Sequence, residues 1–174
     1  MKKVAVMTLC VVCSLVVFIT AVFCVFNILF PFKYKQEILD SSQTNSLNKG
    51  LVASIIYAES RFNKKAKSEK GAIGLMQLLP STAEKFYDGD VFEEELLYDP
   101  IINIETGCKF LKYLIDKYHD ETTVLACYNA GEGVVRGWMD ENTTTIKKSQ
   151  IRYKETLNYV NKVQKYKNLY EKRF

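Results

Sequence analysis

The side chain with the clearest chemical potential is Glu59, which ends a run of apolar residues at helical spacing. Leu51, Val52, Ile55 and Ile56 recur on one face of this predicted helix, and Glu59 falls on the same face. A carboxyl group in apolar surroundings loses hydration, which raises its pKa toward the neutral range that a general acid needs. The alternative is an ordinary glutamate that solvates the end of its helix, since most Glu side chains are exposed.

A second polar candidate is Gln77, which stands alone inside the apolar run of residues 75–79. An amide in such a run is either buried with local partners or in contact with a ligand. Gly71 and Gly74 precede it closely, so we expect backbone turns there, or a close approach of another group to the main chain. Met76 fits a wall of a binding site and a core position equally well.

The elements that must position these residues are predicted to be helices. The first runs to Glu59 or Ser60 and is capped by Asn45 or Ser46, and another begins at Pro80 with a capping box from Ser81 to Glu84. No alternating run is long enough for a major sheet. The sequence therefore predicts a mainly α domain, and the further helices expected from apolar periodicity cover residues 101–118, 122–129 and 153–170.

An uncharged apolar run covers residues 4–30, and Lys2 and Lys3 precede it. At helical rise the run spans about 40 Å, more than the hydrocarbon core of a bilayer. We expect an uncleaved anchor with a cytoplasmic N-terminus, because the run is longer than a signal-peptide core and no small-residue cleavage site follows it. A cleaved signal is the alternative. The predicted parts are an anchor over residues 1–32, a polar tether over 33–48 and a folded domain over 49–174.

Charge and cysteine content narrow the class of protein. A net charge of +4 in 174 residues gives no basic signature of nucleic-acid binding. Three of the five cysteines lie in the apolar run, and Cys108 and Cys127 are left to pair or to stay free. His119 is the single histidine, and no Cys/His spacing typical of a metal site occurs. We expect neither a metal nor a cofactor.

Four short segments stand out together along the chain. They are Glu59-Ser60, Gly74-Leu75-Met76-Gln77, Tyr128-Asn129-Ala130-Gly131, and Glu155-Thr156 with Tyr159-Val160. In this order and spacing they resemble the catalytic domain of soluble-type lytic transglycosylases, relatives of goose-type lysozyme. The resemblance spans residues 51–166 and implies a lysozyme-like, mainly helical domain, preceded here by one transmembrane helix, with a groove for a glycan strand of peptidoglycan.

The resemblance also implies roles for individual residues. Glu59 would be the single catalytic acid and base, Ser60 would help to hold its carboxyl group, and Tyr159 would bring a phenol close to it. Tyr159 also fits a packing residue of an amphipathic helix. The residues implied to line the groove or bind the N-acetyl sugars are Met76, Gln77, Tyr128, Asn129 and Glu155.

The implied reaction cleaves the β-1,4 bond between N-acetylmuramic acid and N-acetylglucosamine. The 6-hydroxyl of the muramic acid serves as nucleophile and closes a 1,6-anhydro ring, so one carboxylate suffices where ordinary glycosidases use two. The enzyme would be a single-pass protein of the cell membrane with its catalytic domain on the cell-wall side. The alternatives are a lysozyme-type hydrolase on the same scaffold and a non-catalytic module that binds the wall.

Overall fold

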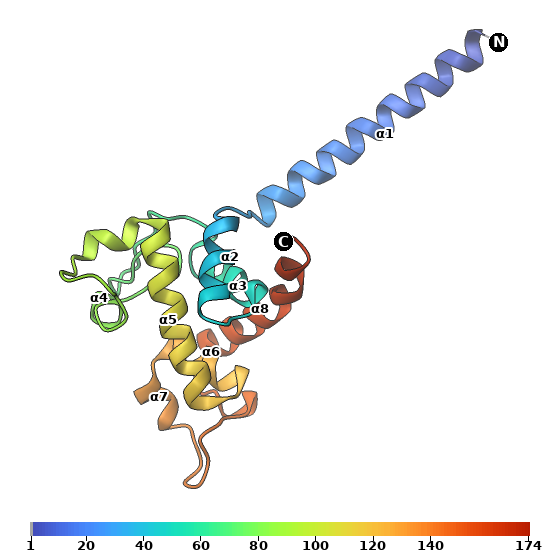
Figure 1. The fold of residues 1–174 in the computed structure, drawn as a ribbon. Coiled ribbons are helices and arrows are strands. Elements are labelled where there is room, and N and C mark those ends of the chain that lie inside the picture. The colour runs from blue at the N-terminus through green and yellow to red at the C-terminus, as the bar shows by residue number, and fades with distance from the viewer. Residues whose placement is uncertain (1) are drawn as a thin grey trace. The chain divides into compact units, whose positions relative to one another are not determined.

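The computed structural model describes residues 2–174, which divide into two compact units, one ending at Phe32 and the other formed by Lys33–Phe174. Met1 and the side chain of Lys2, on which the predicted cytoplasmic N-terminus partly depends, lie outside the described part. Within it the chain forms helices and two isolated bridges but no strand, which confirms the mainly α class. The helices are α1 Lys2–Leu29, α2 Lys35–Thr44, α3 Lys49–Ser60, α4 Pro80–Ala83, α5 Pro100–Tyr118, α6 Glu121–Ala130, α7 Glu132–Arg136 and α8 Lys154–Glu171, with 3₁₀ turns Glu94–Tyr98 and Lys148–Gln150 (Figure 1).

Helix α1 is a continuous apolar helix whose described side chains are largely exposed. Its segment Met7–Leu29 is long and apolar enough to cross a membrane. A bilayer is the environment in which such a surface avoids contact with water. The helix is therefore suited to membrane association, as the sequence predicts.

Helix α2 lies where the sequence analysis expects a tether, and this is a difference from the prediction. Ile38 is fully buried, Ser42 is nearly so, and α2 packs against α3 and α5. The helix carries few large apolar side chains, so its periodic pattern is weak, and burial of Ile38 against neighbouring helices stabilises it instead. The folded unit accordingly begins at Lys33.

Helix α3 is the central element of the folded unit and packs mainly against α8. Asn48, rather than Asn45 or Ser46, caps it by accepting a hydrogen bond of 2.8 Å from the Leu51 N–H. Tyr57 of α3 makes an edge contact with Tyr166 and a tilted contact with Tyr170, both on α8, at ring separations of 5.1 and 5.5 Å. This packing fixes the helix that carries Glu59 against the helix that carries Tyr159.

The remaining helices frame the loops of the site. Pro80 occupies the first turn of α4 as predicted, but the expected capping box from Ser81 to Glu84 is absent because Leu79 takes the cap position. Asp99 caps α5 and Asp120 caps α6, each through its carboxylate.

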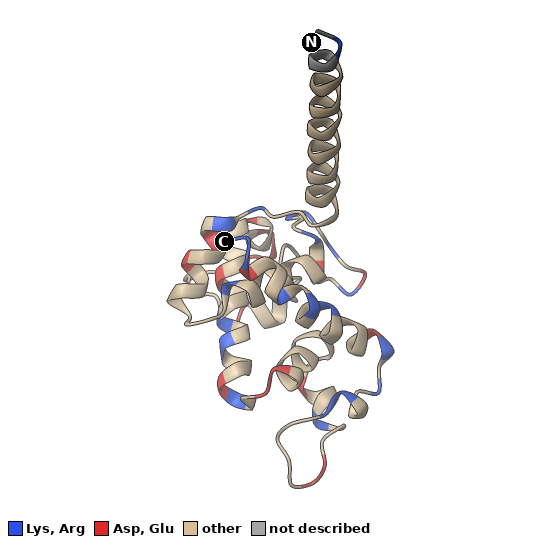
Figure 2. Cartoon of the chain, turned by 90° about the vertical axis from the view of Figure 1, so that its right-hand side faces the viewer, with Lys and Arg blue, Asp and Glu red and all other residues tan. Residues whose placement is uncertain are grey.

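Acidic and basic residues are interspersed over the helices of the domain (Figure 2). Cys108 and Cys127 are buried free thiols.

Candidate active site

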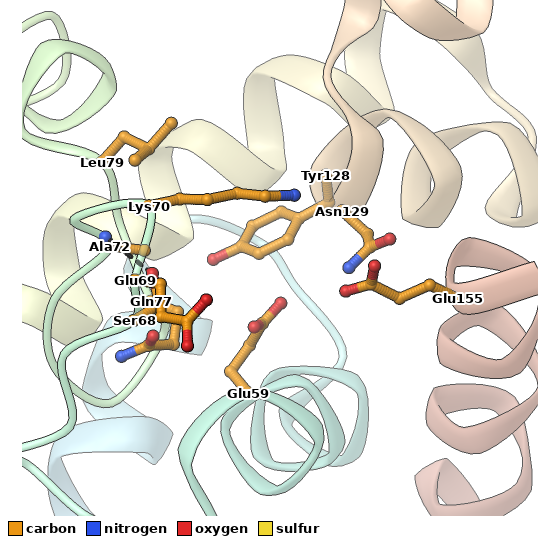
Figure 3. A pocket seen from close by; sticks show the side chains of 10 residues that line it. All are labelled: Glu59, Ser68, Glu69, Lys70, Ala72, Gln77, Leu79, Tyr128, Asn129 and Glu155. Carbon is orange, nitrogen blue, oxygen red and sulfur yellow. Dashed lines mark hydrogen bonds between the residues drawn. The ribbon is translucent and has the colours of Figure 1, made fainter. Parts of the chain in front are cut away.

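A groove of about 440 Å³ opens beside the C-terminal end of α3 (Figure 3). Its lining residues are Glu59, Ser68, Glu69, Lys70, Ala72, Gln77, Leu79, Tyr128, Asn129 and Glu155. The structure thus brings together, from four separate stretches of the chain, the predicted residues Glu59, Gln77, Tyr128, Asn129 and Glu155. Ser60, Met76 and Tyr159 lie behind this surface rather than in it.

Glu59 sits one residue before the end of α3 and presents its carboxyl group to the groove (Figure 3). Burial raises the pKa of this carboxyl from 4.5 to about 7, and the charge of Glu155 adds to the rise. The phenol of Tyr159 and the positive charge of Lys162 lower the pKa of Glu59 and so oppose this rise. A carboxyl group with this pKa holds its proton in about half of the molecules at neutral pH, as a group that alternates between acid and base requires.

The phenol of Tyr159 lies next to Glu59, as the sequence analysis predicts. Its oxygen is buried and makes no hydrogen bond in the described part of the chain, but it is close enough to help to stabilise the ionised carboxylate. Burial, followed by the charge of Glu59, raises the pKa of Tyr159 well above 10. Tyr159 is therefore a neutral dipole beside the acid.

Ser60 acts on the backbone rather than on the carboxyl group of Glu59. Its hydroxyl donates a hydrogen bond of 2.8 Å to the Leu75 carbonyl and approaches the Ile56 carbonyl at 3.2 Å. A hydroxyl has one hydrogen, so this donor is not available to the Glu59 carboxylate. Ser60 instead ties the end of α3 to the turn that carries Gln77.

That turn depends on two residues with positive φ, Gly74 at 81° and Gln77 at 48°. A Cβ at Gly74 would also clash with the Asn103 amide and the Leu97 carbonyl, so the position requires glycine on both grounds. Gln77 is a non-glycine residue in the left-handed region, a conformation that is uncommon and costs energy. The predicted backbone turn is present, and it directs the Gln77 side chain into the groove.

Asn103 of α5 holds the same turn from behind and is fully buried. Its Oδ1 accepts a hydrogen bond of 2.8 Å from the Met76 N–H. Its Nδ2 donates to the carbonyls of Ile73 at 3.0 Å and Leu97 at 2.8 Å. No role for Asn103 is predicted from the sequence, although an Asn among the apolar positions of a helix is a signal for a buried amide with local partners.

Met76 does not line the groove, so its predicted place in the groove wall is wrong, and the alternative of a core position is the one observed. Its side chain is fully buried and packs against Gly107 of α5, where a Cβ would collide with its sulfur. The turn at Gly74 directs Met76 inward. Gly107 has no side chain, and this leaves the space that the Met76 side chain fills. Only its backbone serves the site, because its carbonyl accepts a hydrogen bond of 2.9 Å from the Tyr128 hydroxyl.

The two amides of the groove have opposite hydrogen-bonding character. Both N–H groups of Gln77 are directed at carbonyls, of Gly74 at 2.9 Å and Ala66 at 3.2 Å, so its Oε1 remains as an acceptor. Asn129 accepts a hydrogen bond of 2.8 Å at Oδ1 from the Thr156 hydroxyl, so its Nδ2 is directed outward as a donor. Thr156 is nearly fully buried, and the sequence analysis gave it no role of its own.

Two charged residues of α8 flank the acid. Glu155 is exposed in the groove and raises the pKa of Glu59, while Lys162 lowers it. Lys162 donates a hydrogen bond of 3.0 Å to the Ala58 carbonyl, so it is held at the end of α3. Residues 2–174 hold no group of three or more His, Cys, Asp and Glu side chains suited to a metal ion.

Comparison with known proteins places this arrangement in a family. The family described as Transglycosylase SLT domain matches residues 36–151. The soluble lytic murein transglycosylase of Salmonella typhimurium is 31% identical over an aligned length of 150, and the match covers 81% of this chain and 23% of the relative. The membrane-bound lytic murein transglycosylase C of Haemophilus influenzae is 33% identical over an aligned length of 141, and the match covers 71% of this chain and 38% of the relative.

Solved structures show the same fold. An inactive mutant of the lytic transglycosylase Slt from Pseudomonas aeruginosa superposes with a TM-score of 0.77 at 27% identity, over 84% of this chain and 25% of that one. The 70 kDa soluble lytic transglycosylase of Escherichia coli gives 0.72 at 29% identity, over 83% and 25%. The chain thus spans well under half the length of the curated relatives that it matches. The family match nevertheless covers more than half of this chain, and the chain belongs to the Transglycosylase SLT domain family.

Proposed function

We propose that this protein is a membrane-anchored murein lytic transglycosylase with Glu59 as its acid and base. It cleaves the β-1,4 bond between N-acetylmuramic acid and N-acetylglucosamine in peptidoglycan. The observation that carries the proposal is the Glu59 carboxyl group, which faces the groove with a pKa of about 7 between the amides of Gln77 and Asn129. The names of the murein transglycosylases that the chain resembles support the choice of substrate.

In the first step protonated Glu59 donates its proton to the glycosidic oxygen. The bond between that oxygen and the anomeric carbon of the muramic acid breaks, and the N-acetylglucosamine leaves with the electron pair and the proton. In the second step the Glu59 carboxylate removes the proton of the muramic acid's own 6-hydroxyl, whose oxygen bonds to the anomeric carbon. The products carry no added water, and the acid is regenerated.

The paired amides suit the recognition of an acetamido group, which has one acceptor and one donor. Asn129 Nδ2 donates to the acetamido carbonyl, and Gln77 Oε1 accepts from its N–H. Both side chains are uncharged, so they orient the sugar without lowering the pKa of the acid as a cation would. Tyr128 closes the groove wall, with its hydroxyl held by the Met76 carbonyl. Tyr159 lies beside the acid, Ser60 ties the end of α3 to the turn that carries Gln77, and the exposed Glu155 stands at the α8 side of the groove.

The proposed domain organisation places residues 1–32 as a single-pass anchor and residues 33–174 outside the membrane, facing the wall. Helix α1 supports the anchor by its length and apolar composition. The folded unit starts at Lys33, so the chain runs from the anchor into the catalytic domain without a long linker. The glycan strand is the partner of the groove.

The test is mass spectrometry of muropeptides released from purified sacculi by the full chain in detergent, with Glu59→Gln and Glu155→Gln alongside. The proposal expects products with anhydromuramic ends from the wild type and Glu155→Gln, and none from Glu59→Gln. Hydrated reducing ends would instead assign a lysozyme-type hydrolase on the same scaffold. Binding to sacculi without release by any of the three proteins would assign a non-catalytic wall-binding module.

A further inference from the structure

Lys70 is the one cationic side chain among the groove-lining residues of the described chain. The other charged side chains that line the groove are acidic, and they are Glu59, Glu69 and Glu155. No ion pair of Lys70 occurs within residues 2–174, and its side chain is exposed. The wall of the groove therefore carries one positively charged side chain, and the other side chains that line it are neutral or acidic.

A hydrogen-bonded loop fixes the position of Lys70. Ser68 donates through its N–H to the Ala72 carbonyl at 2.9 Å, and Gly71 donates to the Ser68 carbonyl at 3.0 Å. The Ser68 hydroxyl accepts a further bond of 3.0 Å from the Ala72 N–H. Gly71 has a φ of 82°, which lets the loop turn directly after Lys70. The backbone of this lysine is thus held in place at the groove edge.

The lysines of this loop are not equivalent. Lys67 forms an ion pair of 3.4 Å with Glu94, which gives it a partner within the protein. Lys70 instead extends over the groove toward Tyr128 and Asn129, away from the carboxylate of its neighbour Glu69 (Figure 3). A cation that is presented to a binding groove without a partner is available to an anionic group of the ligand.

We propose that Lys70 binds a carboxylate on the 3-O substituent of the muramic acid, which makes it a specificity-determining residue. This inference rests on the proposed function. The N-acetyl sugars of the strand are neutral, so the anions near the scissile bond belong to that substituent. They are either the lactyl carboxylate of a strand without peptides or a carboxylate of the peptide stem. Glu69 and Glu155 repel either one, which leaves Lys70 as its partner in the groove.

The test uses the full chain in detergent on soluble, uncrosslinked peptidoglycan fragments in three forms. The first has intact stems with free carboxylates, the second has those carboxylates converted to neutral methylamides, and the third has had its stems removed to expose the lactyl carboxylate. Lys70→Gln is compared with Lys70→Arg, which keeps the charge, and with Lys65→Gln, which removes an exposed lysine of the same loop outside the groove.

Exposed ion pairs contribute little, so Lys70→Gln is expected to raise KM about two- to fivefold on a charged substrate with kcat unchanged. Lys70→Arg and Lys65→Gln are expected to match the wild type, and the methylamide substrate is expected to show no effect of Lys70→Gln. A rise on the stem-bearing fragments alone identifies a stem carboxylate, and a rise on the stripped strands identifies the lactyl group.

An equal loss on the methylamide substrate, an equal loss in Lys65→Gln, or no change on any substrate would overturn the assignment. The same comparison made by binding, with Glu59→Gln as the common background, separates this inference from the proposed function. If the wild type released no product, the proposed function would fail, while the effect of Lys70→Gln on binding would still decide the role of Lys70.

Discussion

The hydroxyl of Thr156 donates a hydrogen bond of 2.8 Å to Oδ1 of Asn129, and this bond sets which end of the amide faces the groove. Thr156→Val keeps the shape of the side chain but removes the donor. Because a hydrogen bond of this kind contributes about 0.5–1.5 kcal/mol, we expect KM to rise about two- to tenfold. Thr156→Ser retains the hydroxyl and should keep KM near that of the wild type. Equal KM values for Thr156→Val and Thr156→Ser would show that the bond does not orient Asn129.

Glu59 should make the fold less stable as the pH rises. Its pKa is about 7 in the folded protein and 4.5 without burial, so the folded state binds the proton more tightly. Below pH 4.5 both states are protonated and burial carries no ionisation cost. Between 4.5 and 7 the unfolded state ionises more readily, and stability falls until the full cost is reached above pH 7.

Glu59→Gln removes this cost. The free energy of unfolding of the variant, measured relative to that of the wild type, should therefore be higher at pH 8 than at pH 4. The expected gain is about 1–3 kcal/mol, reduced from the full shift because the carboxyl group is partly exposed to the groove. Urea unfolding of the full chain in detergent at both pH values measures it, with Glu69→Gln as the exposed control. A difference between Glu59→Gln and wild type that stays constant from pH 4 to pH 8 would contradict the raised pKa.

Lys162 should set the upper pH limit of activity. Its positive charge lowers the pKa of Glu59, so its removal in Lys162→Gln raises that pKa further. The acid then keeps its proton to higher pH, and the alkaline fall of kcat should move upward relative to the wild type. The matched control is Lys165→Gln, a lysine of the same helix that does not affect the pKa of Glu59. An alkaline limit in Lys162→Gln that stays at the wild-type pH would show that Lys162 does not act on the acid.

Much of this fold could be predicted from the sequence because its main helices have strong apolar periodicity. The segment before Glu59 and residues 101–118 are clear examples, and both form helices. Helix α2 could not be predicted in the same way, because its burial depends on α3 and α5, which meet it only in the folded protein. Local pattern also could not show that Asn48 rather than Asn45 caps α3.

The site shows the same division between local pattern and tertiary structure. Residue type and spacing led to Glu59 and Gln77, the family resemblance led to Asn129, and all three line one groove. The direction of a side chain was not accessible, since Met76 points inward only because Gly107 leaves room for it. The supporting role of Asn103 depends on carbonyls in other segments, which the sequence does not bring together by itself.

Asn103 should be essential to the turn that presents Gln77. Asn103→Ala leaves the Met76 N–H and the carbonyls of Ile73 and Leu97 without their partner inside the fold. We expect the free energy of unfolding to fall by about 2–4 kcal/mol, as buried unsatisfied groups add to the lost bonds. Urea unfolding measures this, and Asn63→Ala, in an exposed loop, serves as the control. A loss no larger than that of the control would show that the turn holds without Asn103.

The central claim is that Glu59 transfers protons within the substrate and no water enters the product. The most direct measurement is the mass of the muropeptides that the full chain releases in water labelled with oxygen-18. We predict anhydromuramic products that carry no label at the anomeric carbon, and no release by Glu59→Gln. Products one water heavier, with one labelled oxygen at that carbon, would contradict the account and show that water is the nucleophile.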